Sequence, residues 1–171
     1  MTVQLFYSVF ETPAGWIGVL GSPEGLRRTT LPQSSQEAAL SLLGNNSSGG
    51  VKQSSHRFTD LEKRFQSYFA GKIVDFPDNL DFSEATSFQR RVWQAARQIP
   101  FGQTRSYAWI ASQAGKPGAA RAAGQALGKN PLPIIVPCHR VLSANGGLGG
   151  FGGGLAMKEF LLKLEKTASA E

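Results

Sequence analysis

The residues with the clearest chemical potential lie in one short segment. Cys138 is the only cysteine of the 171-residue chain, and it is followed directly by His139 and Arg140. The thiolate is the reactive form of cysteine, and a neighbouring cation lowers the pKa of a thiol from about 8.5 into a range of about 3.5–7.5. We therefore expect Cys138 to be a nucleophile with a lowered pKa rather than an inert packing thiol.

The histidine beside it needs a fixed orientation to act as a base. Neighbouring residues of an extended chain point to opposite faces, so either the chain turns at Cys138 or a water carries the proton between Cys138 and His139. An imidazole base also needs a partner on its second nitrogen. The acids of the basic half are Glu159, Glu165 and Glu171. Glu165 is favoured as the deeper residue of the last predicted helix, and the choice over Glu159 stays open.

The segments on either side of the cysteine have unusual compositions. Three prolines in the run 131–137 predict an extended, rigid and buried approach to Cys138. Residues 146–154 contain seven glycines, with Leu148 and Phe151 between them. No phosphate-binding lysine signature accompanies these glycines. We expect this glycine loop (residues 146–154) to bring backbone N–H groups close to a flat ligand beside Phe151.

Charge is distributed unevenly along the chain. Residues 1–84 contain seven Lys/Arg and nine Asp/Glu, whereas residues 85–171 contain eleven and three, so the net charges are −2 and +8. Such an asymmetry is typical of proteins that bind polyanions, and nucleic acid is the predicted partner. A hydrophobic fraction of 41% excludes a disordered chain. One cysteine and two histidines exclude a disulfide framework and a convincing structural metal site.

The first half of the chain predicts a scaffold without a reactive cluster. Turn-separated apolar runs predict an antiparallel meander of strands over 4–10, 16–22 and 26–31. A helix is predicted over 35–43, and then a mobile Asn/Ser/Gly-rich loop over 45–55. A second helix has an apolar stripe and ends at Gly71; the stripe is formed by Leu61, Phe65, Tyr68 and Phe69. The acidic stretch 75–84 is the predicted linker. We expect an N-terminal α/β scaffold domain over 1–80 and a second domain over 81–171.

The second half predicts three short helices before the cysteine. Thr86 and Gln89 have capping-box spacing and begin the first helix. The second is predicted over 106–114, and the third from near Pro117 to Gly128. A glycine-containing turn before the third helix is typical of a helix-turn-helix unit. The third helix presents small side chains around Arg121, which suits entry into a narrow groove, although alanine is also the best helix former and packs anywhere.

No targeting or membrane segment is visible in the sequence. The first residues lack a basic segment followed by an apolar run, and no apolar run approaches the length of a membrane span. Together with the single unpaired cysteine, this predicts a reduced, cytoplasmic protein that does not contact membranes.

The string Pro137-Cys138-His139-Arg140-Val141, with Asn130-Pro131 before it and the glycine loop and Lys158-Glu159 after it, resembles the O6-alkylguanine-DNA alkyltransferases. This family is also called methylated-DNA–protein-cysteine methyltransferases, and the match covers about residues 87–165. The resemblance implies an α+β fold, with an N-terminal ribonuclease-H-like antiparallel sheet with helices and a C-terminal helix-turn-helix (winged-helix-like) catalytic domain. It implies DNA repair by direct reversal of damage, in a single-turnover enzyme without a cofactor.

The resemblance also implies how DNA is bound. Double-stranded alkylated DNA is contacted through its minor groove, by a protein expected to be a monomer; cooperative binding along DNA stays open. Arg121 matches the residue that fills the space left by an extruded guanine. Tyr107 matches the residue that helps to rotate the backbone and contacts the flipped base, which must leave the duplex to be reached.

A set of roles in the transfer follows from the same resemblance. Cys138 takes the alkyl group from O6-alkylguanine irreversibly, and activity on O4-alkylthymine stays open. His139, oriented by Glu165, takes the thiol proton through a water, and Asn130 braces this network. The remaining matches concern the base: the carbonyls of Cys138 and Val141 receive the guanine amino group, the Gly152 N–H reaches O6, and Lys158 lies near the glycine loop.

One departure and two alternatives accompany this interpretation. Phe151 stands where many relatives have tyrosine, so the stacking surface is kept and a hydroxyl is lost. The first alternative is a lesion sensor that binds DNA without using Cys138 for transfer. The second is a cysteine hydrolase built from Cys138, His139 and Glu165, which leaves the +8 charge unexplained.

Overall fold

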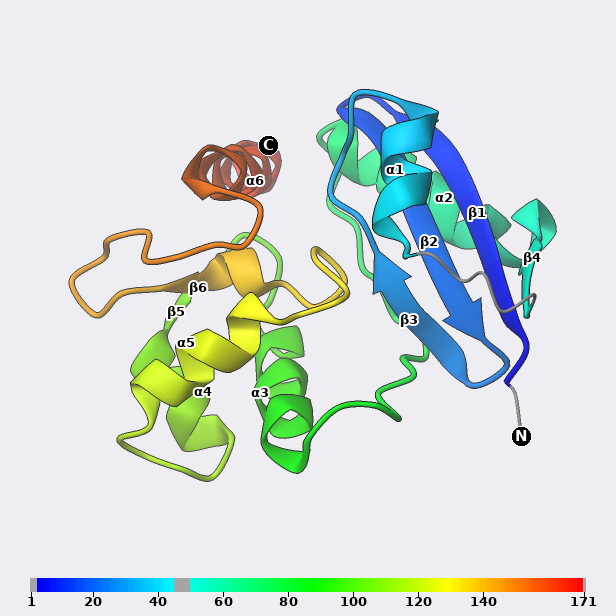
Figure 1. Cartoon of the computed structure of the whole chain (residues 1–171). Coiled ribbons are helices and arrows are strands. Elements are labelled where there is room, and N and C mark those ends of the chain that lie inside the picture. The colour runs from blue at the N-terminus through cyan, green and yellow to red at the C-terminus, as the bar shows by residue number, and fades with distance from the viewer. Residues whose placement is uncertain (1–2, 45–49, 171) are drawn as a thin grey trace. The chain divides into compact units, whose positions relative to one another are not determined.

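The computed structural model describes residues 3–44 and 50–170. The fold is mixed α+β, with a four-stranded sheet, a two-stranded sheet and six α-helices among these residues. The chain divides into two compact units, Met1–Phe82 and Ser83–Glu171 (Figure 1). Residues 45–49, in the predicted mobile loop, lie outside the described residues. None of the described helices is both long and apolar enough to cross a membrane.

The first unit is built on a sheet with the strand order β3-β2-β1-β4. The antiparallel meander is confirmed: its strands are β1 (Leu5–Thr12), β2 (Gly15–Ser22) and β3 (Gly25–Thr29). The prediction of a loop is wrong for residues 51–53, because β4 (Val51–Gln53) pairs in parallel with β1. An edge strand leaves unpaired backbone groups, and β4 supplies partners for those of β1.

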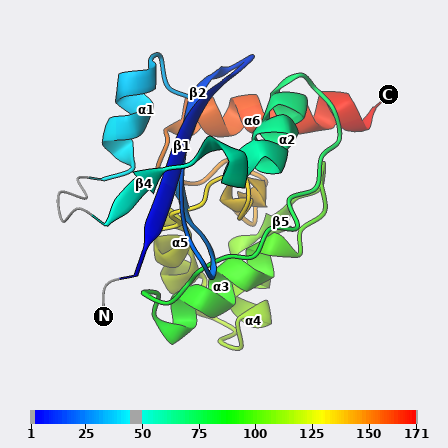
Figure 2. The same cartoon turned by 90° about the vertical axis from the view of Figure 1, so that its right-hand side faces the viewer.

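Helices cover both faces of this sheet. Figures 1 and 2 show α1 (Gln36–Leu42) and α2 (Thr59–Phe69) on opposite sides of it. Ser35 caps α1, since its side chain accepts the N–H of Ala38. The predicted stripe of α2 is confirmed as core: Leu61, Phe65, Tyr68 and Phe69 are all buried. Strand β2 is buried along most of its length, as expected for a strand covered on both faces.

The acidic stretch is tied to the first unit over much of its length. Arg64 pairs with Asp78, and Arg27 Nε lies 2.8 Å from Asp81 Oδ2. The N–H of Leu26 also donates to the carbonyl of Asn79. These contacts hold residues 78–81 against α2 and β3, so the interval between the two units is shorter than the predicted linker.

The second unit contains the remaining helices: α3 (Ser87–Arg97), α4 (Tyr107–Gln113), α5 (Ala120–Gly128) and α6 (Leu155–Ser169). The Thr86–Gln89 capping box is confirmed. The third predicted helix begins at Ala120 rather than near Pro117, because Gly118 has a φ of +88° and interrupts the helical backbone. Trp93 Nε1 donates to the Ala126 carbonyl at 2.8 Å and so ties α3 to α5. Strands β5 (Arg105–Ser106) and β6 (Val141–Leu142) pair in parallel.

Candidate active site

A cavity of about 600 Å³ in the second unit has Cys138 on its wall. Helices α4 and α5 contribute Tyr107 and Arg121, and the glycine loop contributes Phe151 and Gly152. The structure therefore brings together residues from four separate stretches of the chain. The rest of the lining consists mostly of small or apolar residues: Ala108, Ala120, Gly124, Gln125, Leu127, Gly128, Ser143, Ala144 and Gly150.

The chain turns at the cysteine. Cys138–Arg140 forms one turn of 3₁₀ helix, so the chain turns at the cysteine. The turn does not bring His139 into a direct hydrogen bond with the thiol, because Nδ1 has no partner among the described residues. The approach over 131–137 is buried as predicted, but the prediction of an extended run is wrong. The N–H of Val136 donates back to the Leu132 carbonyl at 2.8 Å, and Ile134 between them has a φ of +75°. That conformation is costly for a β-branched residue, so surrounding contacts must hold it.

Asn130 supplies such contacts and also reaches the sulfur. Its Oδ1 accepts the N–H of Leu132, and its Nδ2 donates to the Val136 carbonyl, both at 2.9 Å. The same Nδ2 lies 3.2 Å from Cys138 Sγ, within hydrogen-bonding distance of sulfur. One side chain thus closes the turn before the cysteine and orients the thiol.

The predicted lowering of the thiol pKa is wrong. Burial raises the pKa of Cys138, against the opposing effects of the Asn130 hydrogen bond and the positive charge of Lys158. The neighbouring side chains do not offset this, because His139 and Arg140 both bind Glu165. The thiol is therefore mostly protonated near neutral pH, and its reaction requires a proton acceptor.

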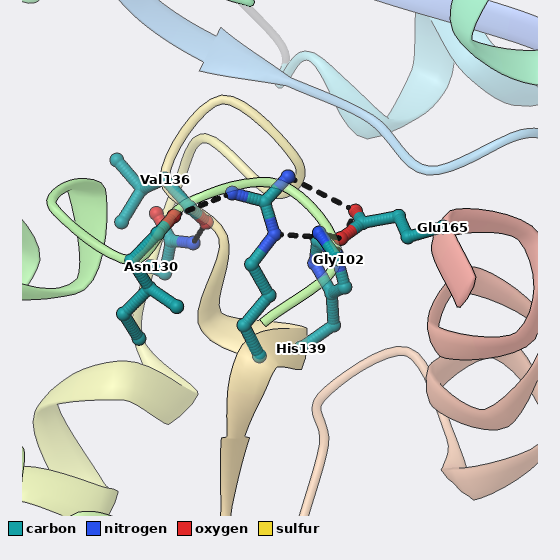
Figure 3. A network of polar contacts seen from close by, with 7 residues as sticks. Gly102, Asn130, Val136, His139 and Glu165 are labelled. Carbon is teal, nitrogen blue, oxygen red and sulfur yellow. Dashed lines mark hydrogen bonds and ion pairs between the residues drawn. The ribbon is translucent and has the colours of Figure 1, made fainter. Parts of the chain in front are cut away.

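His139 Nε2 lies 2.5 Å from Glu165 Oε2 (Figure 3), and both side chains are buried. Glu159, the alternative acid, is exposed. Arg140 holds the same carboxylate through Nε at 2.7 Å and Nη2 at 3.1 Å. The Gly102 N–H donates to Oε1 at 3.3 Å. Although burial alone raises the pKa of Glu165, its bonds to His139 and Arg140 hold the value at about 2.

These contacts determine which nitrogen of His139 can accept a proton. Burial lowers the pKa of His139, which favours the neutral ring. An ionised carboxylate only accepts hydrogen bonds, so Nε2 carries the proton and Nδ1 has the free lone pair. Among the described residues, Nδ1 has no hydrogen-bond partner. The arrangement is that of an oriented neutral base.

Lys158 is fully buried and holds the glycine loop. Its Nζ donates to the carbonyls of Leu148, of Val141 at 2.6 Å and of Gly150 at 3.2 Å. It also lies 3.4 Å from Tyr107 Oη. Lys158 thus lies near the glycine loop, as predicted, but it does not line the cavity. The Val141 carbonyl, which the resemblance assigned to the substrate, already accepts a hydrogen bond from Lys158.

Sequence reasoning missed two contributors. Arg140 bridges Glu165 and the carbonyl of Ile99, to which its Nη1 donates at 2.7 Å. Gly149 leaves room for the Tyr107 side chain, because a Cβ at position 149 would lie 2.6 Å from Tyr107 Oη. The only available signals were the adjacency of Arg140 to the histidine and the abundance of glycine in the loop. Neither of these signals indicates which residue Arg140 or Gly149 contacts.

Comparisons with known proteins agree with this geometry. A family model described as the DNA binding domain of 6-O-methylguanine DNA methyltransferase matches residues 87–167. A methylated-DNA–protein-cysteine methyltransferase of Methanosarcina acetivorans is 40% identical over 161 residues, which cover 94% of this chain and 98% of that relative. The crystal structure of Mycobacterium tuberculosis OGT in complex with DNA matches with a TM-score of 0.78 at 39% identity, over 95% of this chain and 94% of that one. The chain therefore belongs to the methylated-DNA–protein-cysteine methyltransferase family.

Proposed function

We propose that this protein repairs DNA by moving the alkyl group of O6-alkylguanine onto Cys138, one group per protein molecule. The single observation that carries the proposal is the position of Cys138. Cys138 lines the cavity of about 600 Å³, and the next residue, His139, forms a buried pair with Glu165. Membership of the family and a relative's structure in complex with DNA support the same activity.

The reaction first requires removal of the proton from the Cys138 thiol. Burial raises the pKa of Cys138, so the sulfur must lose its proton as it attacks. The free lone pair on His139 Nδ1 accepts this proton through one bridging water. The resulting imidazolium is stabilised by the carboxylate of Glu165, which Arg140 keeps ionised. Asn130 donates to Sγ and stabilises the developing thiolate.

The transfer itself is a displacement at saturated carbon. The sulfur forms a bond to the alkyl carbon, the bond from that carbon to O6 breaks, and its electron pair stays on the guanine. The guanine anion takes up one proton, which balances the proton that the thiol gave to His139, and leaves as neutral guanine. The product is a thioether, which no group at the site can hydrolyse, so the protein is consumed and no cofactor takes part.

DNA is the partner, and the second unit binds it. We assign α4 and α5 to a helix-turn-helix unit of winged-helix type that enters the minor groove. Arg121 then fills the space of the extruded base, while Tyr107 contacts the base in the cavity; both line it. Phe151 stacks on the base, and the Gly152 N–H and the Cys138 carbonyl contact its edge. The Val141 carbonyl accepts the guanine amino group with the lone pair that its hydrogen bond from Lys158 leaves free. The net charge of +8 on residues 85–171 supports this assignment.

The first unit serves as the scaffold. Its antiparallel β1–β3 with β4 parallel to β1 supports a ribonuclease-H-like type. We place the boundary of the scaffold and alkyl-acceptor domains near residue 81. We further propose that the protein acts as a monomer in the cytoplasm, where a lone thiol stays reduced.

The test is the mass of the intact protein after mixing with duplex DNA that carries one O6-methylguanine. The native protein is expected to gain one methyl group, and a Cys138→Ala variant none. An unchanged native mass with tight binding to the lesion would overturn the proposal in favour of a lesion sensor.

A further inference from the structure

Helix α5 exposes two long side chains. Its other residues are alanines and glycines, apart from Leu127, which is buried. The two exposed residues with longer side chains are Arg121 and Gln125, and both line the cavity that contains Cys138. The proposed function gives Arg121 a role and gives none to Gln125. Gln125 is therefore the long polar side chain of this helix that the reaction, as described so far, does not use.

The spacing of Arg121 and Gln125 places them on one face of α5. Residues four positions apart are neighbours on a helix surface, and they are separated by about 6 Å along the helix axis. Base pairs in a duplex are stacked about 3.4 Å apart. When Arg121 fills the space of the extruded base, Gln125 is therefore within reach of a base pair one or two steps away. Within residues 3–44 and 50–170, no hydrogen bond or ion pair engages the Gln125 side chain, so its amide is available to DNA.

The minor groove offers an amide one informative contact. A glutamine side chain has both N–H donors and a carbonyl acceptor. Every base pair presents the acceptors N3 or O2 in the minor groove, so a bond donated to them does not distinguish one base pair from another. The 2-amino group of guanine is the donor that only G·C pairs present there. A bond from this amino group to Gln125 Oε1 therefore distinguishes G·C pairs from A·T pairs.

We propose that Gln125 makes alkyl transfer depend on the base pairs beside the lesion, because its Oε1 accepts a hydrogen bond from the 2-amino group of a guanine one or two steps away. The inference rests on the proposed function, since α5 must enter the minor groove for Gln125 to meet a base edge. Gln125 carries no charge, in contrast to Arg121. Its contact therefore adds a sequence preference rather than general affinity for the phosphate backbone.

The experiment compares duplexes that carry O6-methylguanine and differ in one nearby base. A guanine is replaced by hypoxanthine, which lacks the 2-amino group and leaves the major-groove edge of the base pair unchanged. The replacement is made in turn at the first and second positions on each side of the lesion, in either strand. The second-order rate constant of methyl transfer is measured by intact mass for the native protein and Gln125→Met. Gln94→Met is the matched control, since Gln94 is an exposed residue of α3 that does not line the cavity.

In the native protein, the rate constant should fall about fivefold when the guanine that Gln125 contacts becomes hypoxanthine, as expected for the loss of one hydrogen bond. Gln125→Met has a side chain of similar length without an amide, and it should react equally with both duplexes. Gln94→Met should keep the native difference. Gln125→Ala should also lose the difference, which keeps the test decisive if Gln125→Met folds poorly. Gln125→Glu retains an acceptor oxygen and should retain a preference for guanine.

Two results would overturn the inference. Equal rates with guanine and hypoxanthine at every position in the native protein refute the contact and leave the proposed function intact, because transfer still occurs. The same dependence on the 2-amino group in the native protein, Gln125→Met and Gln125→Ala assigns that dependence to another residue or to the weaker pairing of hypoxanthine. Failure of methyl transfer from every duplex would instead refute the proposed function itself.

Discussion

His139 donates a 2.5 Å hydrogen bond to Glu165, which lies 26 positions later on the last helix. Arg140, the next residue after the histidine, binds the same carboxylate. One buried anion therefore receives two consecutive side chains, and neither of them acts as a counter-charge for the thiol of Cys138. The consequence is a protonated thiol next to a neutral, oriented base, rather than a preformed thiolate.

Replacing the shared carboxylate tests this arrangement. Glu165→Gln removes the anion that stabilises protonated His139, and it leaves the buried charge of Arg140 uncompensated. We expect alkyl transfer to slow by roughly 100-fold or more, and the free energy of unfolding to fall by about 3–5 kcal/mol. Single-turnover mass kinetics and urea unfolding measure the two effects. Glu159→Gln, an exposed change on the same helix, is the control. Equal losses in both variants would contradict the assignment.

The pKa of Glu165 also predicts how stability depends on pH. The folded value of about 2 lies below the ordinary value of 4.5, so the folded protein binds fewer protons than the unfolded chain between these values. Ionised Glu165 therefore contributes its full stabilisation above about pH 4.5, and this contribution disappears as the pH falls toward 2. Urea unfolding should show a difference between native protein and Glu165→Gln that shrinks from pH 6 to pH 3. A constant difference would refute the prediction.

The buried ammonium of Lys158 is expected to hold the glycine loop. Lys158→Met leaves the carbonyls of Val141 and Gly150 without this donor, at about 1–3 kcal/mol for each unsatisfied group. Hydrogen exchange in residues 146–154 should become faster, and transfer should slow by roughly 10- to 100-fold as Tyr107 loses its position. Lys163→Met changes an exposed lysine of the same helix and should alter neither measurement. Unchanged exchange in Lys158→Met would exclude a role in holding the loop.

The hydrogen bond from Asn130 to the sulfur predicts a change in thiol reactivity. Asn130→Ala removes a donor that lowers the pKa of Cys138, so this pKa should rise further. The measurement is the rate of modification by iodoacetamide as a function of pH, with the midpoint expected at higher pH in the variant. Asn145→Ala, in the exposed loop after β6, should leave the midpoint in place. A midpoint shifted to lower pH would contradict the role of Asn130.

Binding to undamaged duplex DNA should depend strongly on salt. Phosphate contacts release counterions, so the excess of positive charge on residues 85–171 predicts a Kd that rises at least about tenfold between 50 and 200 mM salt. Cys138→Ala is suitable for this titration, because it separates binding from transfer. An affinity that does not change with salt would argue against an electrostatic DNA-binding surface on the second unit.

Much of the local structure could be predicted because it depends on neighbouring residues. The capping box of Thr86 and Gln89 requires residues three positions apart, and the stripe of α2 follows the period of a helix. The early hairpins follow from turn residues between apolar runs. Strand β4 was missed because its three residues have little pattern of their own and are ordered by the edge of β1.

The sequence by itself identified the nucleophile, the neighbouring histidine, the glycine loop and the partner class, since these follow from residue type, adjacency and charge. Only the tertiary structure decided that Glu165 rather than Glu159 binds His139. It also showed that the Arg140 guanidinium binds the Glu165 carboxylate and not the thiol. It also decided that burial raises the pKa of Cys138. The physical reason is that desolvation and hydrogen-bond geometry depend on what surrounds an atom, and Arg140 meets Ile99 across 41 positions of sequence.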